Sequence, residues 1–224
     1  MKVEALLCDI DGTLVESNWL HAESWQRSFA EIGIKVELDT VRRQIGKGGD
    51  ELIPVFVSWW RQEAVSEPLK AYRKFLFESE YLSQVKPLPR AKEFLERVKA
   101  VGIRPALATS ASSKDLESYK KLVGMEDLIE EQSSADDTDR AKPHPDIFTA
   151  TLKKLGLKPG QVLALGDTPY DAEAAGKAGI STIGVESGGW SRSDLLESGC
   201  IEVYRDVAEL LERFEESALG RWRP

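Results

Sequence analysis

The sequence predicts an α/β protein with a Rossmann-like core, in which a doubly wound parallel sheet carries helices on both faces. Short apolar segments rich in Val, Ile, Leu and Ala recur along the 224 residues, and helical patterns separate most of them. Such alternation favours a parallel sheet, because each crossover helix packs on a face of the sheet. A further observation, a run of helical patterns directly after the first strand, predicts a helical module inserted into this core.

The elements of the core can be assigned in order from their patterns. The expected strands are residues 3–8, 103–108, 161–165, 182–185 and 201–204. Helices are expected over residues 91–101, 146–155 and 206–214, where apolar residues recur at spacings of three and four. Glycines stand where helices commonly end, at Gly102, Gly156, Gly179 and Gly199.

The inserted module is expected to occupy residues 16–82. This segment is helical by pattern, without a convincing strand, and carries four of the six tryptophans. Two prolines in the following segment, QVKPLP, disfavour a continued helix and indicate the return to the core. The predicted division is therefore core over residues 1–15, helical module over 16–82 and core again over 83–224.

The composition argues against two classes of partner. Thirty Lys and Arg residues against thirty-eight Asp and Glu leave a net charge of −8. An acidic chain without a basic block binds nucleic acids and anionic membranes poorly, so we expect neither partner. No apolar run approaches the length that spans a bilayer, and the first residues carry charge too early for a secretory signal. We expect a cytoplasmic protein with reduced, buried Cys8 and Cys200.

Two aspartates follow the first expected strand. The segment LLCDIDGTL places Asp9 and Asp11 on either side of one isoleucine at the end of an apolar run. Residues i and i+2 of an extended chain point to the same side, so both carboxylates are expected to converge on one spot. Gly12 permits a turn there. A single aspartate is often a helix cap or a solvated residue, whereas two converging carboxylates indicate a bound cation.

Polar residues also follow the later strands. Thr109 and Ser110 begin a run of hydroxyls ahead of a helical pattern, which suits either an anion site or ordinary helix capping. Lys142 precedes two prolines in KPHPD, which restrict its position more than that of a surface lysine. Asp167 directly follows another apolar strand, and Asp171 comes one helical turn later.

All these side chains belong to the carboxyl ends of strands, the edge at which α/β sheets bind ligands. Asp9, Asp11 and Asp167 together offer oxygen ligands for a hard divalent cation. Mg²⁺ fits best, because it takes few carboxylates and completes its shell with water and phosphate oxygens. Lys142 and the Thr109 hydroxyl supply donors for the same phosphate. The sequence thus predicts a Mg²⁺ site that binds a small phosphorylated metabolite.

Four segments resemble the ordered motifs of the haloacid dehalogenase-like superfamily. They are DIDGTL with Asp9 and Asp11, the strand end at Thr109, KPHPDIF with Lys142, and GDTPYD with Asp167 and Asp171. The resemblance covers essentially the whole chain, and four motifs in this order are a specific signal. The helical module is similar to the C1-type cap of the phosphoglycolate phosphatase and β-phosphoglucomutase branch.

The resemblance implies a phosphatase and a role for each catalytic residue. Asp9 would be the nucleophile that forms an aspartyl-phosphate. Asp11 would be general acid to the leaving oxygen and then general base for water, with a pKa raised by its neighbours or by closure over the site. Thr109, with Ser110 after it, would hold the phosphoryl oxygens, and Lys142 would neutralise charge between nucleophile and phosphate.

The resemblance also implies how the metal is bound. Asp9, Asp167 and the backbone carbonyl of Asp11 would bind Mg²⁺. Asp171 would either support the metal shell or orient Lys142.

Two residues of the cap are candidates for contact with the substrate, and each has a structural alternative. Lys47 lies in IGKGGDEL, whose position matches the substrate-reading cap loop of the family. It could bind a distal anion or a sugar hydroxyl, or simply belong to a connection between helices. His21 could act on the proton chemistry beside Asp11, or serve as a hinge or packing residue.

The motifs also bear on the branch of the family. The founding dehalogenases lack an acid at the position of Asp11, which argues against their chemistry. Mutases of this type usually show a Glu-Asp pair where this chain has Gly166-Asp167, so we favour a phosphatase over the alternative, a β-phosphoglucomutase-like phosphotransferase. A phosphate-ester sensor that keeps the fold without turnover is a third hypothesis. We expect a monomer or a weak homodimer.

Overall fold

A computed structural model describes residues 3–222 of the chain. Its core contains a six-stranded sheet in which every pair of neighbours is parallel, in the order β5-β4-β1-β6-β7-β8. The strands are β1 (Ala5–Cys8), β4 (Arg104–Ala108), β5 (Glu131–Ser133), β6 (Val162–Gly166), β7 (Ser181–Val185) and β8 (Cys200–Tyr204). The predicted fold class and all five predicted strands are confirmed.

The sequence analysis missed β5. This strand reads Glu-Gln-Ser, without an apolar residue, and it pairs on one side only, with β4. An edge strand of three polar residues carries no hydrophobic alternation, so only its pairing with β4 identifies it.

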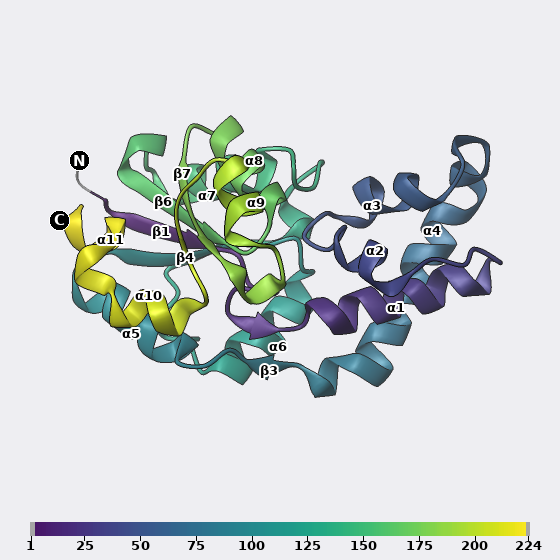
Figure 1. Cartoon of the computed structure of the whole chain (residues 1–224), viewed down its shortest axis with the longest axis horizontal. Helices are drawn as coiled ribbons and strands as arrows, with labels where there is room; N and C mark the ends of the chain where they lie inside the picture. Colours follow the sequence, from purple (N-terminus) through teal and green to yellow (C-terminus); the bar gives the residue numbers. More distant parts are fainter. Residues whose placement is uncertain (1–2, 223–224) are drawn as a thin grey trace.

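Helices cover both faces of the sheet (Figure 1). Side chains of β1 alternate between two apolar clusters, with Leu6 in one and Leu7 in the other. The cluster of Leu6 includes α5 (Ala91–Ala100), α6 (Ser113–Val123), α10 (Val207–Glu212) and α11 (Ala218–Arg221). The cluster of Leu7 includes α7 (Asp146–Leu155) and α8 (Pro169–Lys177), while α9 (Arg192–Glu197) packs on β7 and β8.

The predicted core helices are confirmed with small changes at their ends. The predicted helix over residues 206–214 divides into α10 and a 3₁₀ turn, Phe214–Glu216. The four glycines expected after helices all have positive φ angles, 82° at Gly102, 68° at Gly156, 77° at Gly179 and 104° at Gly199. A residue without Cβ ends a helix in this conformation at little cost.

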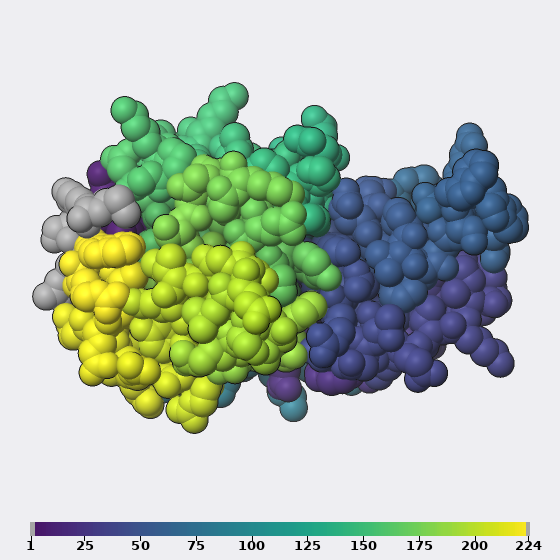
Figure 2. Space-filling model, turned by 45° about the horizontal axis from the view of Figure 1, so that its top comes forward, coloured from purple at the N-terminus to yellow at the C-terminus, as the bar shows by residue number. Residues whose placement is uncertain are grey.

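A second group of helices lies beyond the carboxyl ends of the strands (Figure 1). It consists of α1 (Asn18–Glu31), α2 (Leu38–Arg42), α3 (Gly49–Phe56) and α4 (Trp59–Leu76). A π-helical segment, Phe77–Tyr81, and a 3₁₀ turn, Leu82–Gln84, continue α4. These helices share an apolar cluster of their own around Trp25 and Phe29. Figure 2 shows them as a blue and purple lobe beside the green and yellow core.

The chain passes between the two lobes through a short antiparallel pair, β2 (Val15–Glu16) and β3 (Lys86–Pro87). The sequence analysis assigned no strand there, because two residues are too short for a readable alternation. We propose to treat residues 16–82 as a cap and the rest as the core. Across residues 3–222, none of the helices has both the length and the apolar character needed to cross a bilayer.

Candidate active site

The site lies where the strand order of the sheet reverses. The chain winds outward from β1 to β4 and β5, then returns to β6 on the other side of β1. Asp9 follows β1 and Asp167 follows β6, so these two carboxylates come from neighbouring strands. The backbone N–H of Asp9 donates to the carbonyl of Leu165 at 2.9 Å, which extends the pairing to the start of the site. This crevice is the usual ligand site of an open α/β sheet.

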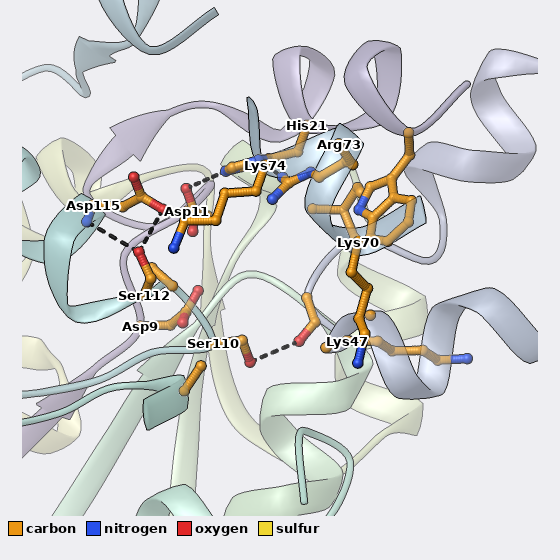
Figure 3. A pocket seen from close by; sticks show the side chains of 17 residues that line it. Asp9, Asp11, His21, Lys47, Lys70, Arg73, Lys74, Ser110, Ser112 and Asp115 are labelled. Carbon is orange, nitrogen blue, oxygen red and sulfur yellow. Dashed lines mark hydrogen bonds and ion pairs between the residues drawn. The ribbon is translucent and has the colours of Figure 1, made fainter. Parts of the chain in front are cut away.

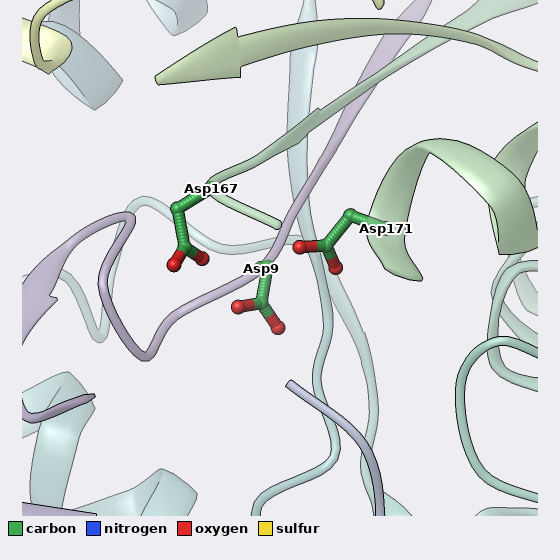
Figure 4. Close-up of side chains that lie close together, drawn as sticks. All are labelled: Asp9, Asp167 and Asp171. Carbon is green, nitrogen blue, oxygen red and sulfur yellow. The ribbon is translucent and has the colours of Figure 1, made fainter. Parts of the chain in front are cut away.

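Asp9, Asp167 and Asp171 form one buried group of carboxylates (Figure 4). One oxygen from each lies within 4.8 Å of the others. The first turn of α8 aims Asp171, because Thr168 caps this helix and donates to Asp171 Oδ2 from its hydroxyl at 2.6 Å. Asp167 accepts hydrogen bonds from Thr13 Oγ1 at 3.0 Å and from Asn18 Nδ2 at 2.8 Å. Fixed, buried oxygens of this kind suit a hard divalent cation.

Lys142 enters the same group from the loop before α7. Its side chain is fully buried, and its Nζ lies 2.7 Å from Asp9 Oδ1 and 2.7 Å from Asp171 Oδ1. A buried ammonium is tolerated only with such partners. Burial alone would lower the pKa of Lys142, but Asp171 and Asp9 raise it above its ordinary value. The lysine is therefore charged and pinned between two carboxylates.

The group still has more negative than positive charge. Burial raises the pKa of Asp9 to about 7, with Lys142 acting against it and the charges of Asp171 and Asp11 adding to it. Burial, then Asp171 and Asp9, raise the pKa of Asp167 well above its usual range. Three carboxylates that share one ammonium therefore resist being ionised at the same time. A divalent cation would supply the missing positive charge. The donor set fits Mg²⁺, because every side-chain ligand is oxygen.

Asp11 is separate from this group. Its Oδ1 accepts from Ser17 Oγ at 2.6 Å and lies 2.8 Å from His21 Nε2. Among residues 3–222 the candidate metal group contains Asp9, Asp167 and Asp171, while Asp11 lines the same pocket as Asp9. The chain turns at Gly12, with φ of 77°, and Asp11 is drawn to the first helix of the cap.

The neighbours of Asp11 lower its pKa, contrary to the expectation that they raise it. Burial by itself raises this pKa, but the charge and hydrogen bond of His21, with the hydrogen bond of Ser17, lower it to about 2. The ring of His21 stacks on Phe77 and its Nδ1 contacts Arg73 of α4. His21 thus contacts Asp11 directly, in addition to packing within the cap.

Thr109 and Ser110 follow β4, as predicted. Thr109 is fully buried, and its Oγ1 accepts from the backbone N–H of Ala111 at 3.1 Å, so its hydroxyl proton stays available to a ligand. Ser110 Oγ lies 3.4 Å from the carbonyl of Gly46 in the cap loop. Ser112 caps α6 by accepting from the N–H of Asp115.

A pocket of about 280 Å³ opens above these residues, between core and cap (Figure 3). Asp9, Asp11, His21, Lys47 and Ser110 all line it. Lys47 points away from Asp9, however. Its ammonium donates to Gln44 Oε1 at 2.7 Å and lies 4.7 Å from the ring centre of Tyr170.

Sequence reasoning missed several residues of the site. Thr13 and Asn18 hold Asp167, Arg73 contacts His21, and Arg42 donates to the carbonyls of Gly188 and Gly189 at 3.1 Å each. Thr13 lies in the DIDGTL segment, so that motif could have identified it as a site residue. The others had no local signal, because their partners lie far away in the sequence.

The chain resembles known proteins over core and cap together. A family model described as haloacid dehalogenase-like hydrolase matches residues 6–185. A phosphoglycolate phosphatase from Pasteurella multocida is 32% identical over 215 residues, 92% of this chain and 96% of the relative. A phosphorylated carbohydrates phosphatase from Thermotoga maritima is 27% identical over 207 residues, 91% of this chain and 94% of the relative. A solved structure, a hydrolase from Pseudomonas syringae, has a TM-score of 0.86 at 26% identity and covers 96% of this chain and 99% of its own.

Proposed function

This chain belongs to the haloacid dehalogenase-like hydrolase family, and from that premise we propose that it is a Mg²⁺-dependent phosphatase of small phosphate monoesters. Relatives described as a phosphoglycolate phosphatase and a phosphorylated carbohydrates phosphatase support this reaction class. The observation that carries the proposal is the buried contact of Lys142 with both Asp9 and Asp171, beside a third carboxylate. A nucleophile, a cation and metal ligands in one buried spot are what phosphoryl transfer requires.

Asp9 is the nucleophile in this proposal. Its carboxylate oxygen attacks phosphorus, the bond from phosphorus to the leaving oxygen breaks, and an aspartyl-phosphate forms. Water then attacks phosphorus, which releases phosphate and restores Asp9. Lys142, the Thr109 hydroxyl and Ser110 bind the phosphoryl oxygens, whose charge spreads in the transition state.

Asp11 handles the protons of both steps. The leaving oxygen takes a proton in the first step, and water loses one in the second. The low pKa of Asp11 keeps its carboxylate ionised, so it can accept the proton of water in the second step. For the acid role, the His21–Asp11 pair can hold the proton, because His21 Nε2 lies 2.8 Å from Asp11 Oδ1. Lys47 lines the pocket from the cap loop, where it would bind a distal anion or a sugar hydroxyl of the substrate or simply connect two helices.

Asp9, Asp167 and the backbone of Asp11 would hold Mg²⁺, with Asp171 supporting them and orienting Lys142. The bound ion would neutralise charge on the carboxylates and on the phosphoryl oxygens. The buried, oxygen-only donor set supports this assignment. In the same proposal the protein is cytoplasmic and exists as a monomer or a weak homodimer.

The nucleophile assignment has a direct test. Asp9→Asn should lower the hydrolysis of p-nitrophenyl phosphate by at least about a thousandfold, because the amide cannot form the covalent intermediate. EDTA should stop the wild-type enzyme, and added Mg²⁺ should restore it. The exposed Asp127→Asn is the matched control and should keep wild-type activity. An active Asp9→Asn protein would remove Asp9 from its role.

The phosphotransferase alternative requires transfer to a second hydroxyl faster than to water. β-Glucose 1-phosphate with a bisphosphate primer separates the two reactions. The phosphatase proposal expects free phosphate as the product, and accumulation of glucose 6-phosphate would favour the mutase instead.

A further inference from the structure

The helix α4 exposes large apolar side chains to solvent. Within residues 3–222 nine large apolar residues are exposed, and four of them belong to this helix: Trp59, Trp60, Tyr72 and Phe75. Trp60 is 68% exposed and Phe75 is 67% exposed. A single exposed apolar residue is ordinary, but several aromatic rings on one helix indicate an interaction surface. The helix begins at the outer end of the cap, away from the sheet, where another molecule can reach it (Figure 1).

Exposed apolar residues form a continuous stripe along α4. They recur at spacings of three and four residues, which puts them on one side of the helix. The stripe consists of Trp60, Ala64, Pro68, Ala71 and Phe75. The opposite side of the helix, with Leu69 and Leu76, is buried. The helix thus has a second apolar side, the α4 stripe, which nothing within residues 3–222 covers.

The α4 stripe has the same pattern of large and small residues in both directions. A large ring stands at each end, Trp60 and Phe75, an alanine lies four residues inside each ring, and Pro68 lies near the centre. When a second α4 is laid antiparallel on the first, Trp60 of one copy faces Phe75 of the other, and Ala64 faces Ala71. Small residues at the inner positions allow the two helices to approach closely. This self-complementary pattern is what a two-fold interface requires.

Charges beside the stripe favour the same antiparallel arrangement. On one flank, Glu63 and Glu67 precede the centre of α4, and Lys70 and Lys74 follow it. A two-fold axis brings the first half of this flank beside the second half of the other copy's flank, so glutamates meet lysines, whereas parallel helices would bring like charges together. Glu67 and Lys70 already pair within the chain. Within residues 3–222, Glu63 and Lys74 have neither a hydrogen bond nor an ion pair, so both can pair with another copy.

We propose that two copies of this chain associate through antiparallel α4 helices about a two-fold axis. Trp60 of each copy packs on Phe75 of the other, and Glu63 pairs with Lys74 at both ends of the interface. The four rings, each about two-thirds exposed in the single chain, bury roughly 400–650 Å² by themselves. With the residues around them, this area lies near the lower limit of specific interfaces, so the dimer is weak and depends on concentration. The surface is independent of the proposed reaction.

Sedimentation velocity tests the interface on the full chain. The wild-type protein should sediment as a monomer at about 1 µM and increasingly as a dimer toward about 500 µM. Trp60→Glu should raise the Kd of the dimer at least about thirtyfold, because a tryptophan at the core of an interface is a typical hot spot. The matched control is Trp59→Glu, since Trp59 is even more exposed, at 83%, but does not belong to the stripe. This control should keep the wild-type Kd.

Charge exchange and cross-linking test the register of the helices. Glu63→Lys and Lys74→Glu should each weaken the dimer, and the double variant, which restores opposite charges across the axis, should recover it. An equimolar mixture of Ala64→Cys and Ala71→Cys proteins should form a mixed disulfide under mild oxidation, whereas each protein alone should form little. All these variants should keep the wild-type circular dichroism, because the replaced side chains are exposed.

Four results would overturn the inference. A wild-type protein that stays monomeric at about 500 µM would assign the stripe to some other partner. A dimer that survives Trp60→Glu, or that responds equally to Trp59→Glu, would lie on another surface. Ready cross-linking of Ala64→Cys with its own copy would show parallel helices instead.

Discussion

Lys142 shows how a single residue decides the charge of the site. It is 1% exposed and contacts one oxygen of Asp9 and one of Asp171. Removing one partner of such a buried arrangement leaves the remaining charges without compensation, which is far more costly than losing a surface ion pair. Even with the lysine in place, burial raises the pKa of Asp9 to about 7, so the proposed nucleophile is easily protonated in the metal-free protein.

The raised pKa of Asp9 predicts a pH dependence of stability. Between about pH 4 and pH 7, the folded metal-free protein keeps a proton on Asp9 that the unfolded chain has lost. The free energy of unfolding should therefore fall as the pH rises through this window, by about 2–4 kcal/mol from this residue. Asp9→Asn should lack this part of the fall. Urea unfolding in EDTA at about pH 5 and about pH 8 measures the difference, and equal falls in both proteins would contradict the assignment.

The loop after β7 connects two elements of the cap to Asp167, one of the proposed metal ligands. The carbonyl of Gly188 accepts from Arg42 at the end of α2 and from Asn18 at the start of α1. Asn18 also donates to Asp167. A Cβ atom at Gly188 would lie 1.6 Å from Asp167 Oδ2, so the close approach of loop and carboxylate requires a glycine there.

A pair of glycine substitutions tests this loop. Gly188→Ala should displace Asp167, weaken Mg²⁺ binding and lower hydrolysis by at least about tenfold, since small misplacements at a reaction centre are costly. Gly176→Ala in α8 is the control, because nothing lies within 4 Å of its added Cβ. That change should leave activity intact and stabilise the protein by up to about 1 kcal/mol through helix propensity. A Gly188→Ala enzyme with wild-type activity would show that the contact is not needed.

At the scale of the whole molecule, the site joins two lobes with separate apolar clusters. The core brings Asp9, Asp167 and Asp171 together, and the cap adds His21, Arg73 and the other cations of α4. Carboxylates that repel each other at the edge of the sheet oppose folding, so a cation bound there should stabilise the whole chain.

Thermal unfolding should reveal this stabilisation. At a Mg²⁺ concentration about a hundredfold above its Kd, the folded state gains about 2.7 kcal/mol, which for a chain of this size raises Tm by about 5–10 °C. Asp167→Asn should abolish most of the rise. Scanning calorimetry with Mg²⁺ and with EDTA gives the comparison. A wild-type Tm that does not respond to Mg²⁺ would argue against the metal site.

The sequence could predict the features that local patterns encode. The five apolar strands, the helices of the core and the glycines after them follow from periodicity and backbone freedom. The polar strand β5 and the pair β2 and β3 could not be predicted, because they are defined by their pairing partners. Asp9, Lys142 and Asp167 were predicted as site residues because each follows an apolar strand or a restricting proline pattern.

By itself, the sequence determined the class of chemistry, since acidic and basic residues at strand ends are set by the order of the chain and the parallel sheet that this order implies. Only the tertiary structure decided which of these residues act on each other. It placed the carboxylate of Asp11 beside His21, brought Arg42 and Asn18 to Gly188, and joined the ammonium of Lys47 to Gln44. The physical reason is that a side chain's pKa and its contacts depend on the neighbours that burial brings within a few ångströms, and for these residues the neighbours come from the packing of the cap on the core.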